Sequence, residues 1–436
     1  MPDSAADLFL PAGAASAQRC AACGAITSEL SGDAECTACG GLFEIVHATP
    51  DAHGAALLAL FGLRCGMKPG SEPSGVWRYK ELVMPSAADP VSHPEGNTPL
   101  LGRASVRTFA RSASLLLKHE GHNPTGSFKD RGMTVAVTQA KRIGARAVAC
   151  ASTGNTSASL AAYAAHAGIP ALVFVPRGQI AIGKLAQSIA YGARTLLVDG
   201  DFDDCLRLAR EASRELGVYL VNSINPWRVE GQKTILFEML QQLGYDAPDW
   251  IALPAGNLGN TSAFGKALRE AFALGLIAKM PRLLAVQAAG AAPFARSFAA
   301  HFATHEPVLA DTLATAIKIG DPASWDRAVR AITETNGVVT SATDDEILEA
   351  KAVIDASGVG CEPASAASVA GVRQLRERGI IGEHERVVAV LTGHVLKDPG
   401  IIQRYHQETE PPPARANRPI EISATVAEVE RVLSLP

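Results

Sequence analysis

From about residue 97 onward, short apolar runs alternate with longer amphipathic or alanine-rich segments. The first apolar runs predict buried strands at 145–152, 171–176, 193–200 and 218–223. The segments between them predict helices at 155–167, 183–191 and 202–216. Later apolar runs predict further strands at 250–256, 282–290, 337–343 and 386–394.

Strands that are apolar throughout and alternate with helices are typical of parallel sheets covered on both faces. The number of predicted strands favours two such sheets, and a chain of 436 residues suits two or three domains. We therefore predict an α/β fold with two open parallel-sheet domains. Residues 405–419 are rich in proline and polar residues, which predicts an extended arm, and residues 421–435 predict one short strand and a helix.

The composition excludes several functional classes. Hydrophobic residues make up 47% of the chain and charged residues 19%, as in an ordinary packed soluble protein. A net charge of −4 without a basic stripe argues against nucleic acid as a partner. Apolar stretches are interrupted before the roughly 18 residues that a membrane span requires. Residues 1–17 lack the basic start of a signal peptide, so we expect a disordered tail and a cytoplasmic location.

The N-terminal region carries a metal-binding pattern. Four of the eight cysteines form two CxxC pairs, which are Cys20 with Cys23 and Cys36 with Cys39. Two such turns can close a tetrahedral site in which four thiolates bind zinc. Gly24 and Gly40 follow the pairs directly, and glycine lets the chain fold back toward the sulfur atoms. We predict a zinc ribbon with a structural ion; a redox dithiol or a metal-free module is the alternative.

Three polar segments lie where predicted strands end, which is where ligands bind in open α/β sheets. In the first, at 122–132, an Asn-Pro-Thr-Gly turn precedes a helix that should begin near Ser127. Lys129 would lie in the first helical turn, where the positive helix end disfavours a charged amine and lowers its pKa. A neutral amine suits Schiff-base chemistry. A solvated lysine beside Asp130 and Arg131 is the plainer alternative.

The second and third segments are strand-to-helix turns with many N–H and hydroxyl donors. The segment STGNTS at 152–157 can bind an anion, or it can simply cap a helix. The segment GNLGNT at 256–261 follows a strand and suits a phosphate. It has neither the Gly-Lys-Ser/Thr of a Walker loop nor the dinucleotide-binding pattern. Each turn alone is weak evidence.

Together these segments resemble the tryptophan-synthase-β-like family of fold-type II pyridoxal-phosphate enzymes and, within it, the threonine synthase family. The motifs that carry the resemblance are NTPLL (97–101), NPTGSFKDRG (123–132), ASTGNTSAS (151–159), PAGNLGN (254–260), GCEPASAAS (360–368) and LTGHVLKDP (391–399). The four-cysteine ribbon and Trp-Arg-Tyr at 77–79 also match. The resemblance covers nearly the whole chain from about residue 18.

The resemblance also implies a domain organisation. The predicted parts are a disordered tail at 1–17, a zinc ribbon at 18–47, a large cofactor-binding domain at 48–133 and 226–404, a small mobile domain at 134–225, and the Pro-rich arm with a C-terminal strand and helix at 405–436. The small domain would close over the substrate and exclude water. A homodimer is the family expectation.

The resemblance implies pyridoxal 5'-phosphate as cofactor. Lys129 matches the Schiff-base lysine, which would also move protons. Asn155 matches the residue that hydrogen-bonds the phenolic oxygen of the cofactor, and Thr392 the hydroxyl beside its pyridine nitrogen. Phe128 would lie near the cofactor, although core packing is the alternative. The cofactor phosphate would be held by Gly256, Asn257, Leu258, Gly259 and Asn260.

A phosphorylated substrate needs a second anion site. The residues that look like the family's substrate-phosphate ligands are Lys184, Asn222, Ser223 and Arg228. Arginine suits phosphate because its guanidinium can donate two parallel hydrogen bonds. The substrate carboxylate would fall to Ser152, Thr153 and Thr156, which can instead share the phosphate. Ordinary surface charge is the alternative for Lys184 and Arg228.

The activity implied by the resemblance is the conversion of O-phospho-L-homoserine and water to L-threonine and phosphate. Several alternatives stay open. One is a β-replacement enzyme that uses O-phosphoserine, such as cysteate synthase, because that substrate is shorter by one methylene. A threonine dehydratase fits less well, since dehydratases lack the ribbon and the VNSINPWR segment at 221–228. The others are a non-catalytic binder of pyridoxal phosphate or phosphorylated metabolites, and a zinc-ribbon interaction protein.

Overall fold

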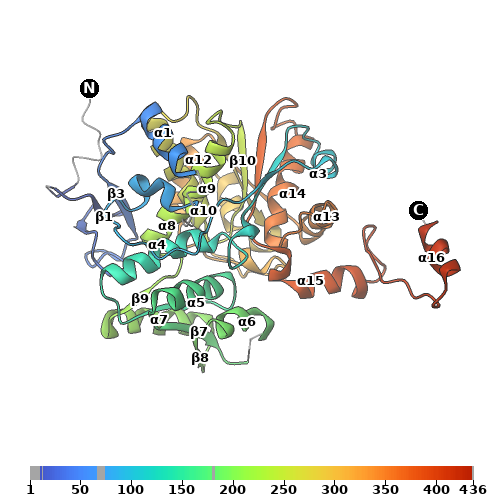
Figure 1. Ribbon diagram of the computed structural model, residues 1–436, viewed down its shortest axis with the longest axis horizontal. Coiled ribbons are helices and arrows are strands. Elements are labelled where there is room, and N and C mark those ends of the chain that lie inside the picture. Colours follow the sequence, from blue (N-terminus) through green and yellow to red (C-terminus); the bar gives the residue numbers. More distant parts are fainter. Residues whose placement is uncertain (1–9, 12, 66–73, 179–181, 435–436) are drawn as a thin grey trace.

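The computed structural model describes residues 10, 11, 13–65, 74–178 and 182–434, which form three sheets and the helices around them (Figure 1). The large sheet has the strand order β12-β11-β10-β13-β5-β4. Its strands are β4 (Leu100–Leu101), β5 (Leu116–His119), β10 (Trp250–Pro254), β11 (Arg282–Ala288), β12 (Val338–Ala342) and β13 (Val387–Leu391). All neighbouring strands are parallel except β4 and β5.

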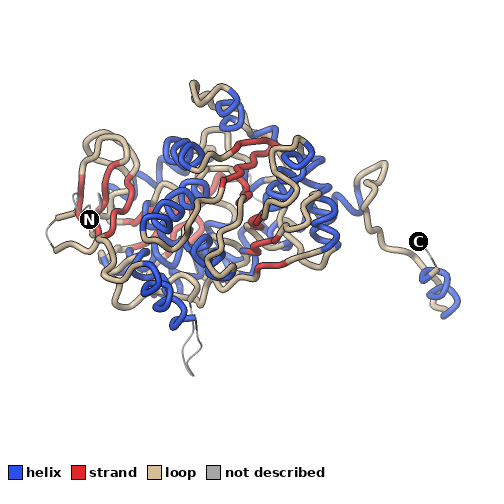
Figure 2. Tube along the Cα trace, turned by 90° about the horizontal axis from the view of Figure 1, so that it is seen from above, coloured by secondary structure: helices blue, strands red, loops and turns tan. Residues whose placement is uncertain are grey.

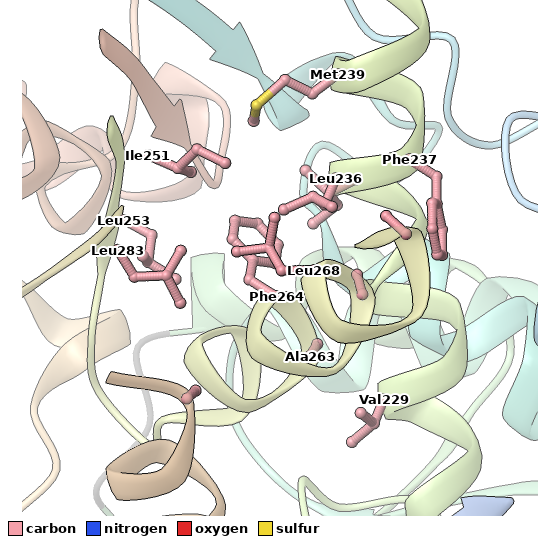
Figure 3. Packing of buried hydrophobic residues seen from close by; sticks show 14 of the residues in the cluster. Val229, Leu236, Phe237, Met239, Ile251, Leu253, Ala263, Phe264, Leu268 and Leu283 are labelled. Carbon is pink, nitrogen blue, oxygen red and sulfur yellow. The ribbon is translucent and has the colours of Figure 1, made fainter. Parts of the chain in front are cut away.

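Both faces of the large sheet are buried. Alternate side chains of β10 enter two different cores, with Ile251 and Leu253 on one face and Trp250 on the other. Figure 3 shows the first core, where α9 (Thr234–Gln242) and α10 (Gly259–Ala273) bring Leu236 and Phe264 toward β10. The other face is covered by α13 (Asp344–Ala356) and α14 (Pro363–Glu377). This two-sided burial explains why these strands are apolar at every position.

The small sheet has the strand order β8-β7-β6-β9, and its neighbours are all parallel. Its strands are β6 (Ala147–Ala151), β7 (Ala171–Pro176), β8 (Arg194–Val198) and β9 (Val218–Leu220). They follow β5 and precede β10 in the chain, so this sheet is an insertion into the large one. Helices α5 (Asn155–Ala167) and α6 (Ile182–Ala190) pack together, and α7 (Phe202–Leu216) buries Cys205 and Ala209 against the strands.

Helix α4 (Lys129–Arg142) lies between the two sheets. Its Val135 belongs to the core of the large sheet, whereas Met133 and Val137 belong to the core of the small sheet. Helix α8 (Pro226–Gln232) crosses it closely, because a Cβ on Gly231 would collide with the backbone carbonyl of Arg131. Helix α4, which begins at Lys129, therefore packs against both the large sheet and the small sheet.

The N-terminal sheet consists of antiparallel strands in the order β2-β1-β3, namely β1 (Ser16–Cys20), β2 (Ile26–Ser28) and β3 (Phe43–His47). We refer to residues 16–47 as the cysteine module. Nε2 of His47 lies 2.8 Å from Oε2 of Glu230 in α8, which fastens the module to the large domain. The predicted tail at 1–17 is too long, since β1 begins at the buried Ser16. Its residues 1–9 and 12 lie outside the described residues.

The C-terminal arm leaves the body of the protein (Figures 1 and 2). After α15 (Pro399–Gln403) and a π-helical turn at Arg404–Glu408, the chain runs without regular structure to α16 (Val426–Leu433). The short strand predicted within 421–435 is wrong, because the described residues before α16 pair with no other strand. A strand needs a neighbour to satisfy its backbone, and this segment runs away from the sheets.

The other predicted elements of the α/β body are present. Helices 155–167 and 202–216 and strand 171–176 have the predicted bounds, whereas the strand expected at 218–223 already ends at Leu220. The α/β class with parallel sheets is confirmed. Among the described helices, none is both long and apolar enough to cross a membrane.

Candidate active site

The predicted site segments follow neighbouring parallel strands in the large sheet and in the small sheet. In the large sheet, β10 and β13 are neighbours, and their carboxyl ends lead into Gly256 and Thr392. In the small sheet, β6 and β9 are neighbours, and they lead into Ser152 and Asn222. Because parallel strands end at one edge of a sheet, the topology brings these segments together in pairs.

The turn before α4 is bonded to the segment after β13. The N–H of Phe128 donates to the carbonyl of Thr392 at 3.0 Å, and the N–H of His394 donates to the carbonyl of Gly126 at 2.9 Å. Ser127 and Gly393 form an antiparallel bridge between these two bonds. These backbone hydrogen bonds form a short ladder and hold the residues just before Lys129 against the segment after β13.

Lys129 is the first residue of α4, and its amine lies 4.2 Å from the centre of the Phe128 ring. Within the described part of the chain, the amine forms no hydrogen bond or ion pair with another side chain. Burial lowers the pKa of Lys129 to about 7, helped by the positive charge of Arg228 and opposed by Glu362. The sequence-based explanation invoked the helix end; in the structure, burial and Arg228 are the main causes. An amine with this pKa is substantially neutral near pH 7.

Asp130 stabilises the turn that precedes α4 through hydrogen bonds of its carboxylate. Its carboxylate accepts hydrogen bonds from the N–H and the hydroxyl of Thr125, at 2.7 and 2.6 Å, and from the hydroxyl of Ser159 at 2.6 Å. Ser159 belongs to α5, so this one carboxylate connects the lysine turn to the small sheet. Burial nevertheless raises the pKa of Asp130 to about 6.

The turn after β6 carries the predicted carboxylate ligands. Ser152, Thr153 and Thr156 are all partly exposed. The hydroxyl of Ser152 accepts the N–H of Gly154 at 3.2 Å. Asn222, predicted as a phosphate ligand, is bonded to the backbone of β6, since its side-chain amide exchanges hydrogen bonds with the N–H and carbonyl of Ala151 at 3.0 and 3.1 Å. It thereby ties the ends of β6 and β9 together.

The loop between β10 and α10 has the features of a phosphate site. Leu258 has a φ of +61°, and the N–H groups of the first turn of α10 lack partners within the helix. A Cβ on Gly256 would lie 2.9 Å from Cα of Ile317, so only glycine fits there. Oδ1 of Asn260 is buried and has no hydrogen-bond donor among the described residues, so it can accept from a donor group of a ligand. Asn257 donates to the hydroxyl of Ser223, so the predicted cofactor loop and the predicted substrate segment touch.

Arg228 is buried in α8, and its guanidinium is only partly satisfied. One nitrogen, Nη1, donates to the carbonyl of Val221 at 3.0 Å, whereas Nε and Nη2 are buried and have no partner in the part of the chain that the structure describes. Burial lowers the pKa of Arg228 to about 10, at which it remains charged. A buried cation with an unused pair of donors is costly unless an anion binds it. Lys184 lies in the first turn of α6, but its side chain lies outside the described part of the structure.

Thr392 lies directly after β13 beside two polar side chains. Its hydroxyl lies 3.0 Å from the hydroxyl of Ser365 and donates to Oε1 of Glu362 at 3.4 Å. The other carboxylate oxygen of Glu362 accepts a hydrogen bond from Nδ2 of Asn155 at 2.9 Å. Glu362 is a site residue that the sequence reasoning missed. Its signal was a lone carboxylate within the otherwise small and apolar motif at 360–368.

The four cysteine sulfur atoms of the cysteine module all lie within 4.8 Å of one another. Sγ of Cys20 is 3.5 Å from that of Cys39, and Sγ of Cys23 is 3.7 Å from that of Cys36. A tetrahedral ion with metal–sulfur bonds of about 2.3 Å requires sulfur separations of about 3.8 Å, so the geometry fits zinc. The glycines after the pairs have the expected left-handed backbone, with φ of +75° at 24 and +74° at 40.

Comparisons with known proteins agree with this geometry. The family model described as pyridoxal-phosphate dependent enzyme matches residues 91–393. The chain is 44% identical over 383 residues to threonine synthase of Methanosarcina acetivorans, covering 87% of this chain and 92% of that protein. It is 41% identical over 419 residues to threonine synthase of Methanocaldococcus jannaschii, covering 95% and 99%. Threonine synthase from Escherichia coli shares the fold, with a TM-score of 0.64 at 21% identity over 93% of this chain and 95% of that one.

Proposed function

The chain belongs to the threonine synthase family of pyridoxal-phosphate-dependent enzymes, and from that premise we propose that it converts O-phospho-L-homoserine and water to L-threonine and phosphate. It is a lyase, and pyridoxal 5'-phosphate is its cofactor. The observation that carries the proposal is that Lys129, whose pKa is lowered to about 7, feels the charge of the buried Arg228. The guanidinium of Arg228 has two donor nitrogens without a partner among the described residues. The lysine suits a carbonyl cofactor, and the arginine suits a phosphorylated substrate.

The residues around Lys129 fit the cofactor. The loop at 256–260 offers backbone N–H groups for its phosphate, and Gly256 leaves room where a side chain would collide with Ile317. Among the described residues, Oδ1 of Asn260 has no hydrogen-bond partner and Asn155 is partly exposed, so both side chains have hydrogen-bonding capacity left for a ligand. Thr392 is the proposed neutral hydroxyl beside the pyridine nitrogen of the cofactor, and a neutral partner would leave that nitrogen largely unprotonated. When bound, the cofactor supplies an electron sink for the carbon atom that carries the substrate amino group.

Lys129 moves the protons in the proposed reaction. Its neutral amine accepts a proton from the carbon atom next to the carboxylate, and the same amine can later return a proton to the product. A pKa of about 7 suits both directions, because neither form of the amine is strongly favoured at neutral pH. The ladder from Ser127 to Gly393 keeps the backbone of this residue in place during the transfers.

Arg228 orients the leaving group. Its free Nε and Nη2 atoms can donate two parallel hydrogen bonds to the substrate phosphate, and they stabilise the charge that grows as the carbon–oxygen bond breaks. The released phosphate stays near the β-carbon, where water adds. Lys184, Asn222 and Ser223 are further proposed phosphate ligands, and Ser152, Thr153 and Thr156 are the proposed ligands of the carboxylate. Closure of the small domain at 134–225 over the large one would exclude bulk water.

We further propose that the cysteine module holds one structural zinc ion. The support is the clustering of four thiols within 4.8 Å, with donor chemistry that zinc prefers. Four protein ligands leave no open position for substrate, so the ion serves the fold. The homodimer remains a prediction of the family resemblance, and the cytoplasmic location remains an expectation from the sequence; light scattering in solution measures the first and fractionation of cells the second.

The reaction itself is tested by mixing the protein with pyridoxal 5'-phosphate and O-phospho-L-homoserine and following phosphate and threonine together. Equal amounts of both products are expected, and both should vanish in Lys129→Ala. If the protein binds the cofactor but forms neither product, the proposed substrate is wrong. O-phosphoserine with sulfite is then the substrate pair to try, because it distinguishes the β-replacement alternative.

A further inference from the structure

Glu362 lies between two of the proposed cofactor ligands, Asn155 and Thr392. It immediately precedes α14, and only 4% of its surface is exposed. Oε2 accepts from Nδ2 of Asn155 at 2.9 Å, and Oε1 lies 3.4 Å from the hydroxyl of Thr392. The charged groups that face it are Lys129, Lys397 and Asp398. None of the proposed steps so far uses this carboxylate.

The position of Glu362 is set by its backbone. Its N–H donates to the carbonyl of Gly393 at 3.1 Å, and its carbonyl accepts from the N–H of Ser365 at 3.1 Å. A Cβ on Gly393 would collide with the carboxylate, so residue 393 must be glycine for Glu362 to lie where it does. The same Gly393 belongs to the ladder beside Lys129. The carboxylate is therefore as well anchored as the lysine.

A carboxylate beside an amide decides which way the amide faces. The oxygen and nitrogen of an asparagine side chain are nearly the same size, so their hydrogen-bond partners determine the orientation. A carboxylate oxygen accepts, so it selects Nδ2 of Asn155 and holds Nδ2 toward itself. The amide nitrogen has two hydrogens, and the second one stays available for a ligand. Without the carboxylate, the amide could turn and present its oxygen to an anionic ligand atom.

We propose that Glu362 is a positioning residue that fixes the Asn155 amide with its free N–H directed at the phenolic oxygen of the cofactor. The inference rests on the proposed role of Asn155 and deepens it. Burial raises the pKa of Glu362, whereas the Asn155 hydrogen bond and the charges of Lys397 and Lys129 lower it. The selection of Nδ2 survives either way, because a carboxyl protonated on Oε1 still accepts through Oε2.

The test is a double-mutant cycle read out by cofactor binding rather than by turnover. The variants are Glu362→Leu, which removes the acceptor and roughly keeps the volume, Glu362→Gln, which keeps one acceptor, Asn155→Ala, and the Asn155→Ala/Glu362→Leu double variant. Glu377→Leu at the other end of α14, with a side chain 37% exposed, is the matched control. Cofactor-free protein is titrated with pyridoxal 5'-phosphate, and the visible absorbance of the bound cofactor is followed against pH.

We expect Glu362→Leu to weaken cofactor binding about tenfold, which corresponds to about 1.4 kcal/mol. The pH midpoint of the absorbance should rise, because a phenolic oxygen without its donor holds the neighbouring proton more strongly. Glu362→Gln should bind nearly as well as the unaltered protein. In the Asn155→Ala background, Glu362→Leu should have little further effect on either quantity, since the two residues act as one unit.

Three results would overturn the proposal. The first is a Glu362→Leu protein with unchanged affinity and midpoint. The second is an equal loss in both backgrounds, which would mark Glu362 as merely structural. The third is an Asn155→Ala protein that binds the cofactor normally, which would refute the role of Asn155 itself while leaving Lys129 untouched. Melting curves check that each variant folds, and Glu362→Ala replaces the leucine variant in the cycle if the latter is insoluble.

Discussion

The N–H of Phe128 donates to the carbonyl of Thr392 at 3.0 Å, which joins the residue before the proposed Schiff-base lysine to the end of the last strand of the large sheet. These two residues come from motifs at opposite ends of the α/β body. Their bond places the amine of Lys129 and the hydroxyl of Thr392 at one site. It also means that a shift of β13 moves the lysine, because no flexible segment separates them.

The pKa of Lys129 predicts how cofactor attachment depends on pH. Because this pKa is about 7 instead of 10.5, the neutral fraction of the amine grows about tenfold per pH unit below pH 7 and levels off above it. The rate at which pyridoxal 5'-phosphate attaches to cofactor-free protein should follow that curve in a stopped-flow absorbance experiment. A rate that keeps rising to pH 9 would show that the amine is an ordinary solvated lysine. Lys129→Ala serves as the control without attachment.

Substitution Arg228→Met should separate activity from stability. Loss of the guanidinium should raise KM for O-phospho-L-homoserine by about 30-fold or more, because a buried charge-assisted contact is worth about 2–5 kcal/mol. In the absence of substrate the variant should melt at a higher temperature, since an unpaired buried charge is removed. Cofactor affinity should stay the same. Arg330→Met, whose guanidinium is about half exposed and paired with Glu334 at 3.0 Å, should change none of these.

The buried ion pairs of Glu238 should make the stability of the protein depend on this carboxylate. Its buried carboxylate lies 2.6 Å from the amine of Lys118 and 2.8 Å from the guanidinium of Arg131. Glu238→Ala leaves Lys118 without its carboxylate and Arg131 with Glu120 as its remaining carboxylate partner, and it should lower the free energy of unfolding by about 3–5 kcal/mol in urea titrations. Glu334→Ala, in a partly exposed ion pair, should cost less than about 1 kcal/mol. Equal losses in the two variants would refute this difference.

The same carboxylate sets a direction for the pH dependence of stability. Burial would raise the pKa of Glu238, but Arg131 and Lys118 outweigh it and lower the pKa below the ordinary 4.5. The unfolded chain then binds more protons than the folded one at acidic pH. Stability from this group is therefore complete above about pH 4.5 and is lost as the pH falls further. Glu238→Ala should flatten this acidic limb in melting curves taken between pH 6 and pH 3.

The cysteine module should contain about one zinc ion per chain when the protein is purified without chelator. Cys20→Ser or Cys36→Ser should lose the ion and expose residues 16–47 to proteolysis, because metal binding and local folding are one process. Cys65→Ser, at an exposed position outside the cluster, should keep the ion. Metal analysis that finds less than about half an ion per chain would refute the zinc assignment.

Gly256→Ala should weaken cofactor binding without unfolding the protein. The new methyl group would lie 2.9 Å from Cα of Ile317, so the loop at 256–260 has to move away from its position. A loss of about tenfold in affinity for pyridoxal 5'-phosphate is expected, together with a small change in melting temperature. Gly154→Ala is the comparison, because a methyl group at Gly154 would meet no atom within 4 Å although this glycine lies in another loop of the site. Unchanged affinity in Gly256→Ala would argue against phosphate binding at this loop.

The periodicity of the chain determined the α/β class, because strands buried on both faces are apolar at every position and helices are not. It also indicated where the motifs lie, since each polar turn directly follows an apolar run. The spacing of the cysteines and the glycines after them indicated the module that the structure forms. The strand expected at 421–435 failed because local pattern does not reveal whether a neighbouring strand is within reach.

Only the tertiary structure decided how the motifs act on one another. The amide of Asn222 is predicted as a ligand from the sequence, and the fold also bonds it to the backbone of Ala151, which no local pattern indicates. Glu362 reads as one carboxylate among many, yet the fold places it between Asn155 and Thr392. The pKa of Lys129 depends on burial and on Arg228, a residue far away in the chain. Burial and through-space charge depend on contacts between distant segments, so a linear sequence predicts which residues are reactive but not which neighbours control them.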